Sequence, residues 1–66
     1  MQNKTPKTEP IPRLLTIPQT AETIQVSEKK VRRLIKTGEL VAYRIGHQLR
    51  IAEEDLRQFL QQRRGL

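Results

Sequence analysis

The sequence predicts a small α+β fold of three short helices and a two-stranded β-hairpin. Apolar residues recur at helical spacing in three segments, and the first two of these begin with a good N-capping residue. One further stretch, residues 41–51, alternates apolar and polar side chains with the period of a strand. The 66 residues allow one domain with a core near the lower size limit for independent folding. We therefore expect a flexible, basic, proline-containing arm at residues 1–13 and a single domain at residues 14–64.

The first helix is expected at residues 17–24. Thr16 and Gln19 have the spacing of a capping box, in which each side chain bonds the backbone of the other residue. Pro18 falls in the first turn, where a missing amide hydrogen costs little. An apolar stripe on this helix would consist of Ile17, Ala21 and Ile24.

The second helix is predicted between Ser27, a favourable N-cap, and Gly38, which can adopt the left-handed conformation that ends a helix. Its buried stripe would consist of Val31, Leu34 and Ile35. Five cations occupy the opposite side and the flanks: Lys29, Lys30, Arg32, Arg33 and Lys36. These like charges repel one another, and only Glu28 offsets them within the helix. An anionic partner is the simplest way to reduce this repulsion. The alternative is a solvated basic face without a partner.

Residues 41–51 are predicted to form a β-hairpin that turns at Gly46 and His47. The odd positions are expected to share one buried face: Val41, Tyr43, Ile45, Leu49 and Ile51. The tip and the outer face would then present Arg44, His47, Gln48 and Arg50. Leu40 is expected to fill the corner between the basic helix and the first strand.

The last helix is expected at about residues 53–64. Its three leading acids, Glu53, Glu54 and Asp55, suit the positive end of a helix dipole and need no catalytic explanation. Its core stripe would consist of Leu56, Phe59 and Leu60. Ala52, at the N-cap position, offers no capping side chain.

Positive charge is concentrated in the middle of the chain. The formal net charge is +6, and residues 27–50 carry seven Lys and Arg against two acids. Such a field favours nucleic acid as the partner, because bound phosphates release their condensed counterions. An anionic membrane surface is disfavoured, since the basic helix lacks a large apolar face. An RNA-binding module is a rival, but Tyr43 and Phe59, the only aromatic residues, are both assigned to apolar stripes.

The same composition argues against several other classes of protein. No apolar run approaches the roughly 20 residues needed to cross a bilayer. The chain has no cysteine, which is compatible with the reducing cytoplasm. His47 is expected at a hairpin tip and Ser27 is explained as a cap, so no catalytic set or metal-ligand set is found. We therefore expect a cytoplasmic, non-enzymatic protein without a metal or a cofactor.

Across residues 14–62 the order of these features resembles the excisionase-like branch of the winged helix-turn-helix superfamily, which is related to the DNA-binding part of MerR regulators. The residues that carry the resemblance are Leu15-Thr16-Ile17, Ala21, Val26-Ser27, Val31-Arg32-Arg33-Leu34-Ile35, Gly38-Glu39-Leu40, Arg44-Ile45-Gly46, Arg50-Ile51 and Glu54-Asp55-Leu56. Three positions depart from the pattern: Gln25 replaces a usual Gly, Val41 a common Pro and Leu49 a frequent Trp.

The resemblance implies a DNA-bending accessory protein that helps an integrase to excise a phage or mobile element, a recombination directionality factor. A small transcriptional regulator is the alternative. For the recombination role, the expected partners are double-stranded DNA, an integrase or recombinase, and further copies of the chain on adjacent sites. No membrane and no small-molecule effector are expected. The expected DNA contacts are Ser27, Lys29, Lys30, Arg32, Arg33 and Lys36 on the basic helix, Arg44, His47, Gln48 and Arg50 on the wing, and the backbone at Thr16. A protein-only adaptor remains a further possibility.

Overall fold

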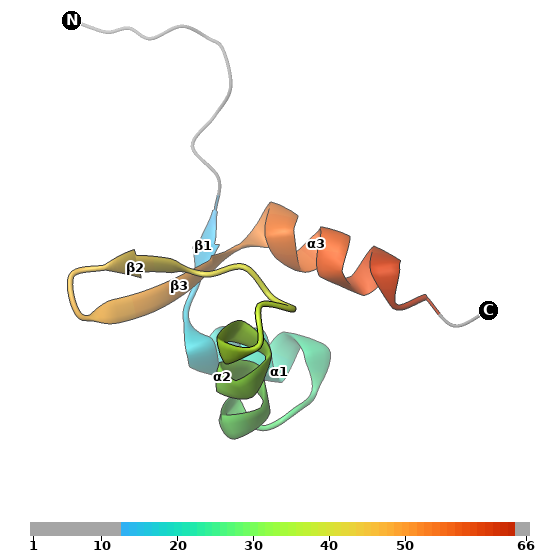
Figure 1. Cartoon of the computed structure of the whole chain (residues 1–66), viewed down its shortest axis with the longest axis horizontal. Coiled ribbons are helices and arrows are strands. Elements are labelled where there is room, and N and C mark those ends of the chain that lie inside the picture. Colours follow the sequence, from blue (N-terminus) through green and yellow to red (C-terminus); the bar gives the residue numbers. More distant parts are fainter. Residues whose placement is uncertain (1–12, 65–66) are drawn as a thin grey trace, which may run out of the picture.

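The computed structural model describes residues 13–64, which form three helices and a small antiparallel sheet (Figure 1). The elements follow in the order β1 (Leu14–Leu15), α1 (Ile17–Ile24), α2 (Glu28–Lys36), β2 (Tyr43–Ile45), β3 (Gln48–Ala52) and α3 (Glu53–Gln62). The predicted α+β class is confirmed. The predicted arm lies outside the described residues except for Arg13, whose backbone carbonyl accepts a hydrogen bond of 2.8 Å from the amide of Glu53.

The sheet contains one strand more than the hairpin that the sequence predicts. Its strand order is β1-β3-β2, and β1 pairs with β3 so that Leu15 lies opposite Ile51. A two-residue strand is too short to show the alternation by which strands are recognised in a sequence. This pairing anchors the start of the domain beside the base of the wing, the hairpin of β2 and β3.

The prediction that the odd positions of the hairpin share one buried face is wrong. In the observed register Tyr43 lies opposite Arg50 and Ile45 opposite Gln48. Directly opposite residues point to the same face, so a two-residue turn places odd positions of β2 with even positions of β3. The apolar side chains of β2 and the segment before it are consequently exposed: Val41 by 54%, Tyr43 by 48% and Ile45 by 54%.

The core lies where α1, α2 and α3 meet the sheet. Its least exposed apolar side chains are Val31, Leu40 and Ile51, at 0%, 1% and 0%, which confirms that Leu40 fills the corner after the basic helix. The remaining core residues are Leu15, Ile17, Ala21, Leu34, Leu56 and Phe59. Thr20, outside the predicted stripe of α1, is also fully buried.

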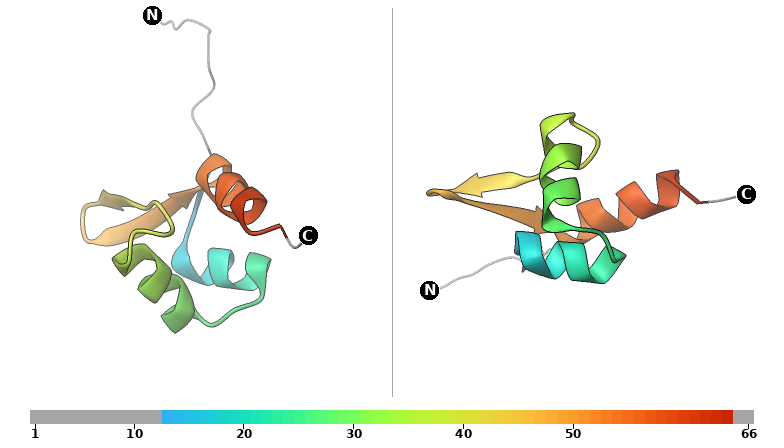
Figure 2. Two further views of the ribbon diagram at one scale, coloured as in Figure 1. Left: turned by 45° about the vertical axis from the view of Figure 1, so that its right-hand side comes forward. Right: turned by 90° about the horizontal axis from the view of Figure 1, so that it is seen from below.

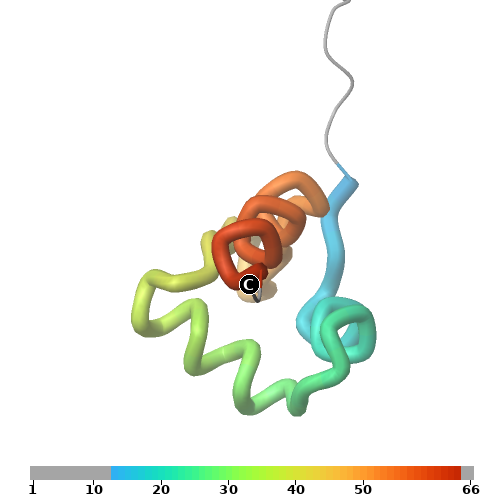
Figure 3. Tube along the Cα trace, turned by 90° about the vertical axis from the view of Figure 1, so that its right-hand side faces the viewer, coloured from blue at the N-terminus to red at the C-terminus, as the bar shows by residue number. Residues whose placement is uncertain are grey.

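Leu60 was expected in the core stripe of α3, but 45% of its surface is exposed. Figure 3 looks along α3 and shows α1 and α2 together on one side of that helix. Leu56 and Phe59 are buried, whereas Leu60 lies at the margin of the helix interface. The arrangement therefore leaves one apolar residue of α3 in contact with solvent.

Local hydrogen bonds at the helix ends agree with the sequence signals. The amide of Gln19 donates to the hydroxyl of Thr16 at 3.1 Å, and the Gln19 side chain accepts from the amide of Thr16 at 3.0 Å, which completes the capping box. The hydroxyl of Ser27 accepts from the amide of Lys30 at 3.0 Å. Ala52 provides no side-chain cap for α3. The first amide of that helix, from Glu53, donates instead to the backbone carbonyl of Arg13.

The turn between α1 and α2 depends on an unusual backbone conformation at Gln25. This residue has φ 60° and ψ 47°, a left-handed conformation that costs an L-residue about 1 to 2 kcal/mol. With Gln25 in this conformation, the amide of Val26 donates to the carbonyl of Ala21 at 3.0 Å, and this bond closes the end of α1. The residue at this position therefore determines how readily the chain turns toward the basic helix.

Replacing Gln25 with glycine is expected to raise the free energy of unfolding by up to about 1 kcal/mol. Glycine adopts this conformation without strain, although its greater freedom in the unfolded chain removes part of the gain. Gln58→Gly, in the exposed interior of α3, is the control and should lower stability by about 1 kcal/mol. Urea unfolding of both variants measures the difference, and equal destabilisation would contradict strain at Gln25.

Candidate nucleic-acid interface

Helix α2 presents its cations to solvent because its apolar residues pack into the core on the opposite side. Val31 and Leu34 are buried and Ile35 is half-buried, while all five cations of the helix are exposed. Arg32 lies 3.6 Å from Glu28, but the two side chains are 60% and 49% exposed. An ion pair this exposed contributes little to stability, so Arg32 can exchange it for an anionic ligand. Within residues 13–64 no ion pair engages the four lysines and arginines that remain on the helix.

Three segments that are distant in sequence meet around one surface hollow of about 280 Å³. The start of α1, the middle of α2 and the first half of β3 each contribute to it. The polar side chains in its lining are Thr16, Arg32, His47, Gln48 and Arg50, and the apolar ones are Ile17, Pro18 and Leu49. The tertiary structure thus gathers five of the eleven predicted contact residues at one place.

The register of the sheet explains why the wing borders this hollow. Residues 48–50 pair with β2 along one edge, whereas β1 pairs only with Ile51 and Ala52 on the other edge. The second edge of β3 at residues 48–50 is therefore free of strand partners among the described residues. The start of α1 and Arg32 lie beside that free edge.

Arg50 is the most constrained cation of the wing. It is half-buried, and its guanidinium donates to the backbone carbonyl of Leu49 at 3.0 Å and to the side-chain oxygen of Gln48. These bonds restrict the rotamers of Arg50, so less side-chain entropy would be lost if it bound an anion. Figure 1 shows the wing projecting from the body of the molecule on the side opposite to α3.

The other predicted contacts are distributed over different surfaces. Lys30 and Arg33 line a second hollow, shared with α3. Arg44 pairs with Leu49 and therefore lies on the face of the wing opposite to Arg50. Lys29 and Lys36 are exposed on α2 but border neither of these two hollows.

Thr16 and Ser27 are both engaged as helix caps. The amide of Thr16 already donates to the Gln19 side chain, so the expected backbone contact at this residue has no free amide hydrogen. Both hydroxyl oxygens accept a capping bond, which leaves each hydroxyl hydrogen to donate to a phosphate.

Tyr43 and Ile45 are further candidate contacts that were not predicted, because the alternation in the sequence assigned them to the core. They lie on the same face of the wing as Arg50 and Gln48 and are about half exposed. The length of the predicted turn could have identified these two residues, because a two-residue turn fixes which residues of β2 and β3 lie opposite one another. An aromatic and an aliphatic side chain next to Arg50 give this face apolar groups that can contact sugars or bases.

Two other features are absent from residues 13–64. In that part of the chain no helix is long and apolar enough to cross a membrane. Nor do residues 13–64 contain a cluster of three His, Cys, Asp or Glu side chains that could hold a metal ion.

Comparison with known proteins gives one family and one relative. A family model described as a helix-turn-helix domain matches residues 14–64. A protein of Bacillus subtilis (strain 168), described as "Uncharacterized protein YvgK", is 50% identical over 44 residues, which are 67% of this chain and 14% of that protein. The chain thus matches only a small part of the length of this relative. No solved structure gives a significant match.

Proposed function

Because the chain belongs to the helix-turn-helix domain family, a family of DNA-binding domains, we propose that it recognises specific sites in double-stranded DNA with α2 and its wing. Helix α2 enters the major groove, and the wing follows the adjacent phosphate backbone and minor groove. The observation that carries this proposal is the convergence of Thr16, Arg32 and Arg50 on one hollow. Cations from separate elements at one surface fit the closely spaced phosphates of a duplex.

The more specific role that we propose is that of a DNA-bending accessory protein for an integrase, a recombination directionality factor. One nine-residue helix and a short wing cover only a small stretch of DNA, so several copies on adjacent sites are expected. Bending a site of this kind by 40 to 90° costs about 1 to 6 kcal/mol, which added wing contacts offset. The candidate wing contacts are Arg44, His47, Gln48 and Arg50. The protein performs no chemical step in this role, since the recombinase exchanges the strands.

A small transcriptional regulator is the second candidate. The hollow formed by α1, α2 and β3 exists before DNA is bound, so the surface can occupy a site without bending it. Occupying a promoter in this way would block other proteins from the same DNA. The two roles share the contact residues and differ in whether the DNA is bent.

A bend assay on duplex DNA with several sites tests the proposed role. The native protein is expected to bend the fragment, and the variant Arg44→Ala, Arg50→Ala is expected to reduce the bend more than the affinity. The reason is that wing contacts are gained only when the duplex curves toward the wing. Energy transfer between dyes at the two ends of the fragment measures the bend, and anisotropy measures the affinity.

The matched control removes two cations from α3 and its end, in the variant Arg57→Ala, Arg64→Ala. It has the same net charge as the wing variant but keeps the surface around Arg50, so the bend should persist. An excision assay with the cognate integrase completes the test. Straight DNA together with excision that proceeds equally without the protein would contradict the recombination role and favour the regulator.

A further inference from the structure

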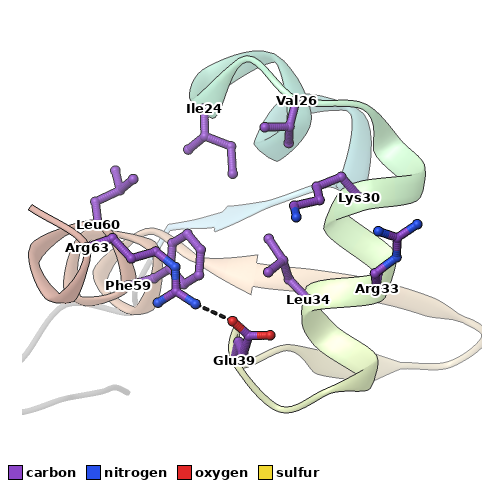
Figure 4. A pocket seen from close by; sticks show the side chains of 9 residues that line it. All are labelled: Ile24, Val26, Lys30, Arg33, Leu34, Glu39, Phe59, Leu60 and Arg63. Carbon is purple, nitrogen blue, oxygen red and sulfur yellow. Dashed lines mark hydrogen bonds and ion pairs between the residues drawn. The ribbon is translucent and has the colours of Figure 1, made fainter. Parts of the chain in front are cut away.

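A second groove lies between α2 and α3, on the side of the molecule away from the hollow that borders the wing. Its volume is about 320 Å³, and Figure 4 shows the side chains that line it. Five of them are apolar and come from α2, α3 and the end of α1 with its turn: Ile24, Val26, Leu34, Phe59 and Leu60. Figures 1 and 2 show that α3 and the wing extend in opposite directions.

The charges around the groove are arranged asymmetrically. Arg63, on the α3 side, forms an ion pair with Glu39, and its guanidinium lies 4.2 Å from the centre of the Phe59 ring. Glu39 also accepts a hydrogen bond of 2.9 Å from the hydroxyl of Thr37. At this end, therefore, the positive charge is neutralised within the protein.

The α2 side of the groove carries cations without such compensation. Lys30 and Arg33 line it, and neither forms an ion pair with any residue from 13 to 64. In Figure 4 the Lys30 side chain extends from α2 toward the space between α2 and α3. The groove thus combines an apolar floor with unpaired positive charge along one rim.

We propose that this groove binds an acidic, amphipathic segment of a partner protein. One or two large apolar side chains of the segment would cover Leu60 and the floor, while its carboxylates pair with Lys30 and Arg33. Helix-in-groove recognition uses this combination of apolar anchors and complementary charges. The proposal goes beyond DNA recognition and does not depend on the recombination role.

Other occupants fit the groove less well. A small molecule would remain largely uncovered, because Leu60, Lys30 and Arg33 are all exposed, whereas ligand sites cover most of the ligand surface. A second copy would offer its exposed wing residues Tyr43 and Ile45, which share their face of the wing with Arg50. Arg50 would meet the cations at the rim, so an acidic partner is favoured over a copy of the chain.

Titration of the isotope-labelled full chain with two synthetic peptides tests the proposal by NMR. Both are helix-forming peptides with leucine at positions spaced by three and four residues, and the remaining positions carry mainly glutamate in one and lysine in the other. The acidic peptide should shift the amide signals around Lys30, Leu34 and Leu60 and bind at least about tenfold more tightly than the basic one. The variant Lys30→Glu, Arg33→Glu should reverse this preference.

Leu60→Gln should lower the affinity for the acidic peptide by about tenfold. The affinity for duplex DNA should be unchanged, since Leu60 lies outside the surface proposed to contact DNA. Val41→Gln is the matched control: it removes a side chain of similar exposure, 54% against 45%, outside the groove, and should leave the peptide affinity unchanged. The proposal is overturned if no groove signal shifts at about 1 mM peptide, or if the basic peptide binds equally well. Concentration-dependent groove shifts without peptide would show a second copy there. Duplex DNA that shifts the Leu60 signal in place of the peptide would assign the floor of the groove to DNA. Either result overturns the proposal.

Discussion

Raising the salt concentration from about 50 to 200 mM is expected to weaken binding to duplex DNA by about a thousandfold. The two elements proposed to contact DNA, α2 and the wing, carry enough exposed cations to neutralise about six phosphates. Each neutralised phosphate contributes about 0.9 to the slope of log affinity against log salt. The slope should therefore be close to about −5. Anisotropy titrations of a labelled duplex at several salt concentrations provide the measurement.

Removing individual cations should change this slope in a position-dependent manner. Lys29→Ala together with Lys36→Ala removes two exposed cations from α2 and should reduce the magnitude of the slope by about 2. The control variant Arg57→Ala, Arg64→Ala removes the same charge elsewhere and should change the slope much less. A flat salt response of the native protein would contradict phosphate binding by this surface.

The largest expected effect on stability comes from Leu40→Ala, which should lower the free energy of unfolding by about 2 to 5 kcal/mol. Leu40 is only 1% exposed and fills the corner between α2 and the sheet. Its amide bonds the carbonyl of Leu34 at 3.1 Å, so the segment that ends α2 is fixed at this point. A domain this small has little stability in reserve, and much of the variant should be unfolded at 37 °C.

Leu60→Ala removes the same atoms at a site that is 45% exposed, and it is the matched control for the core variant. Its cost should stay below about 1 kcal/mol, because the deleted side chain is already partly hydrated. Urea unfolding followed by circular dichroism compares the two variants. If both lose the same stability, the corner formed by Leu40 is not the structural anchor that its burial indicates.

The features that the sequence predicted well depend on residues close together in the chain. The caps at Thr16 and Ser27 act through amides three residues away, and the periodicity of α2 separates its apolar and basic sides within a few turns. Such interactions form in the same way whatever the remaining chain does. The positions of the helices were therefore predictable from local pattern alone.

The features that were missed depend on how distant segments pack. The strand β1 is recognisable only through its pairing with Ile51, and the exposure of Leu60 follows from where α3 lies against α1 and α2. Tyr43 and Ile45 were assigned to the core because a single odd-even alternation was assumed to continue through the turn. A two-residue turn instead places odd positions of β2 on the same face as even positions of β3.

By itself the sequence determined that one short helix carries five cations opposite an apolar stripe, and that a hairpin follows it. Only the tertiary structure decided that Arg32 lies beside the wing while Lys30 and Arg33 border α3. Helical periodicity fixes the angles between side chains around one axis, whereas the neighbour met at each angle depends on contacts made by the rest of the chain. The division of the basic helix between two surfaces is for this reason a property of the fold.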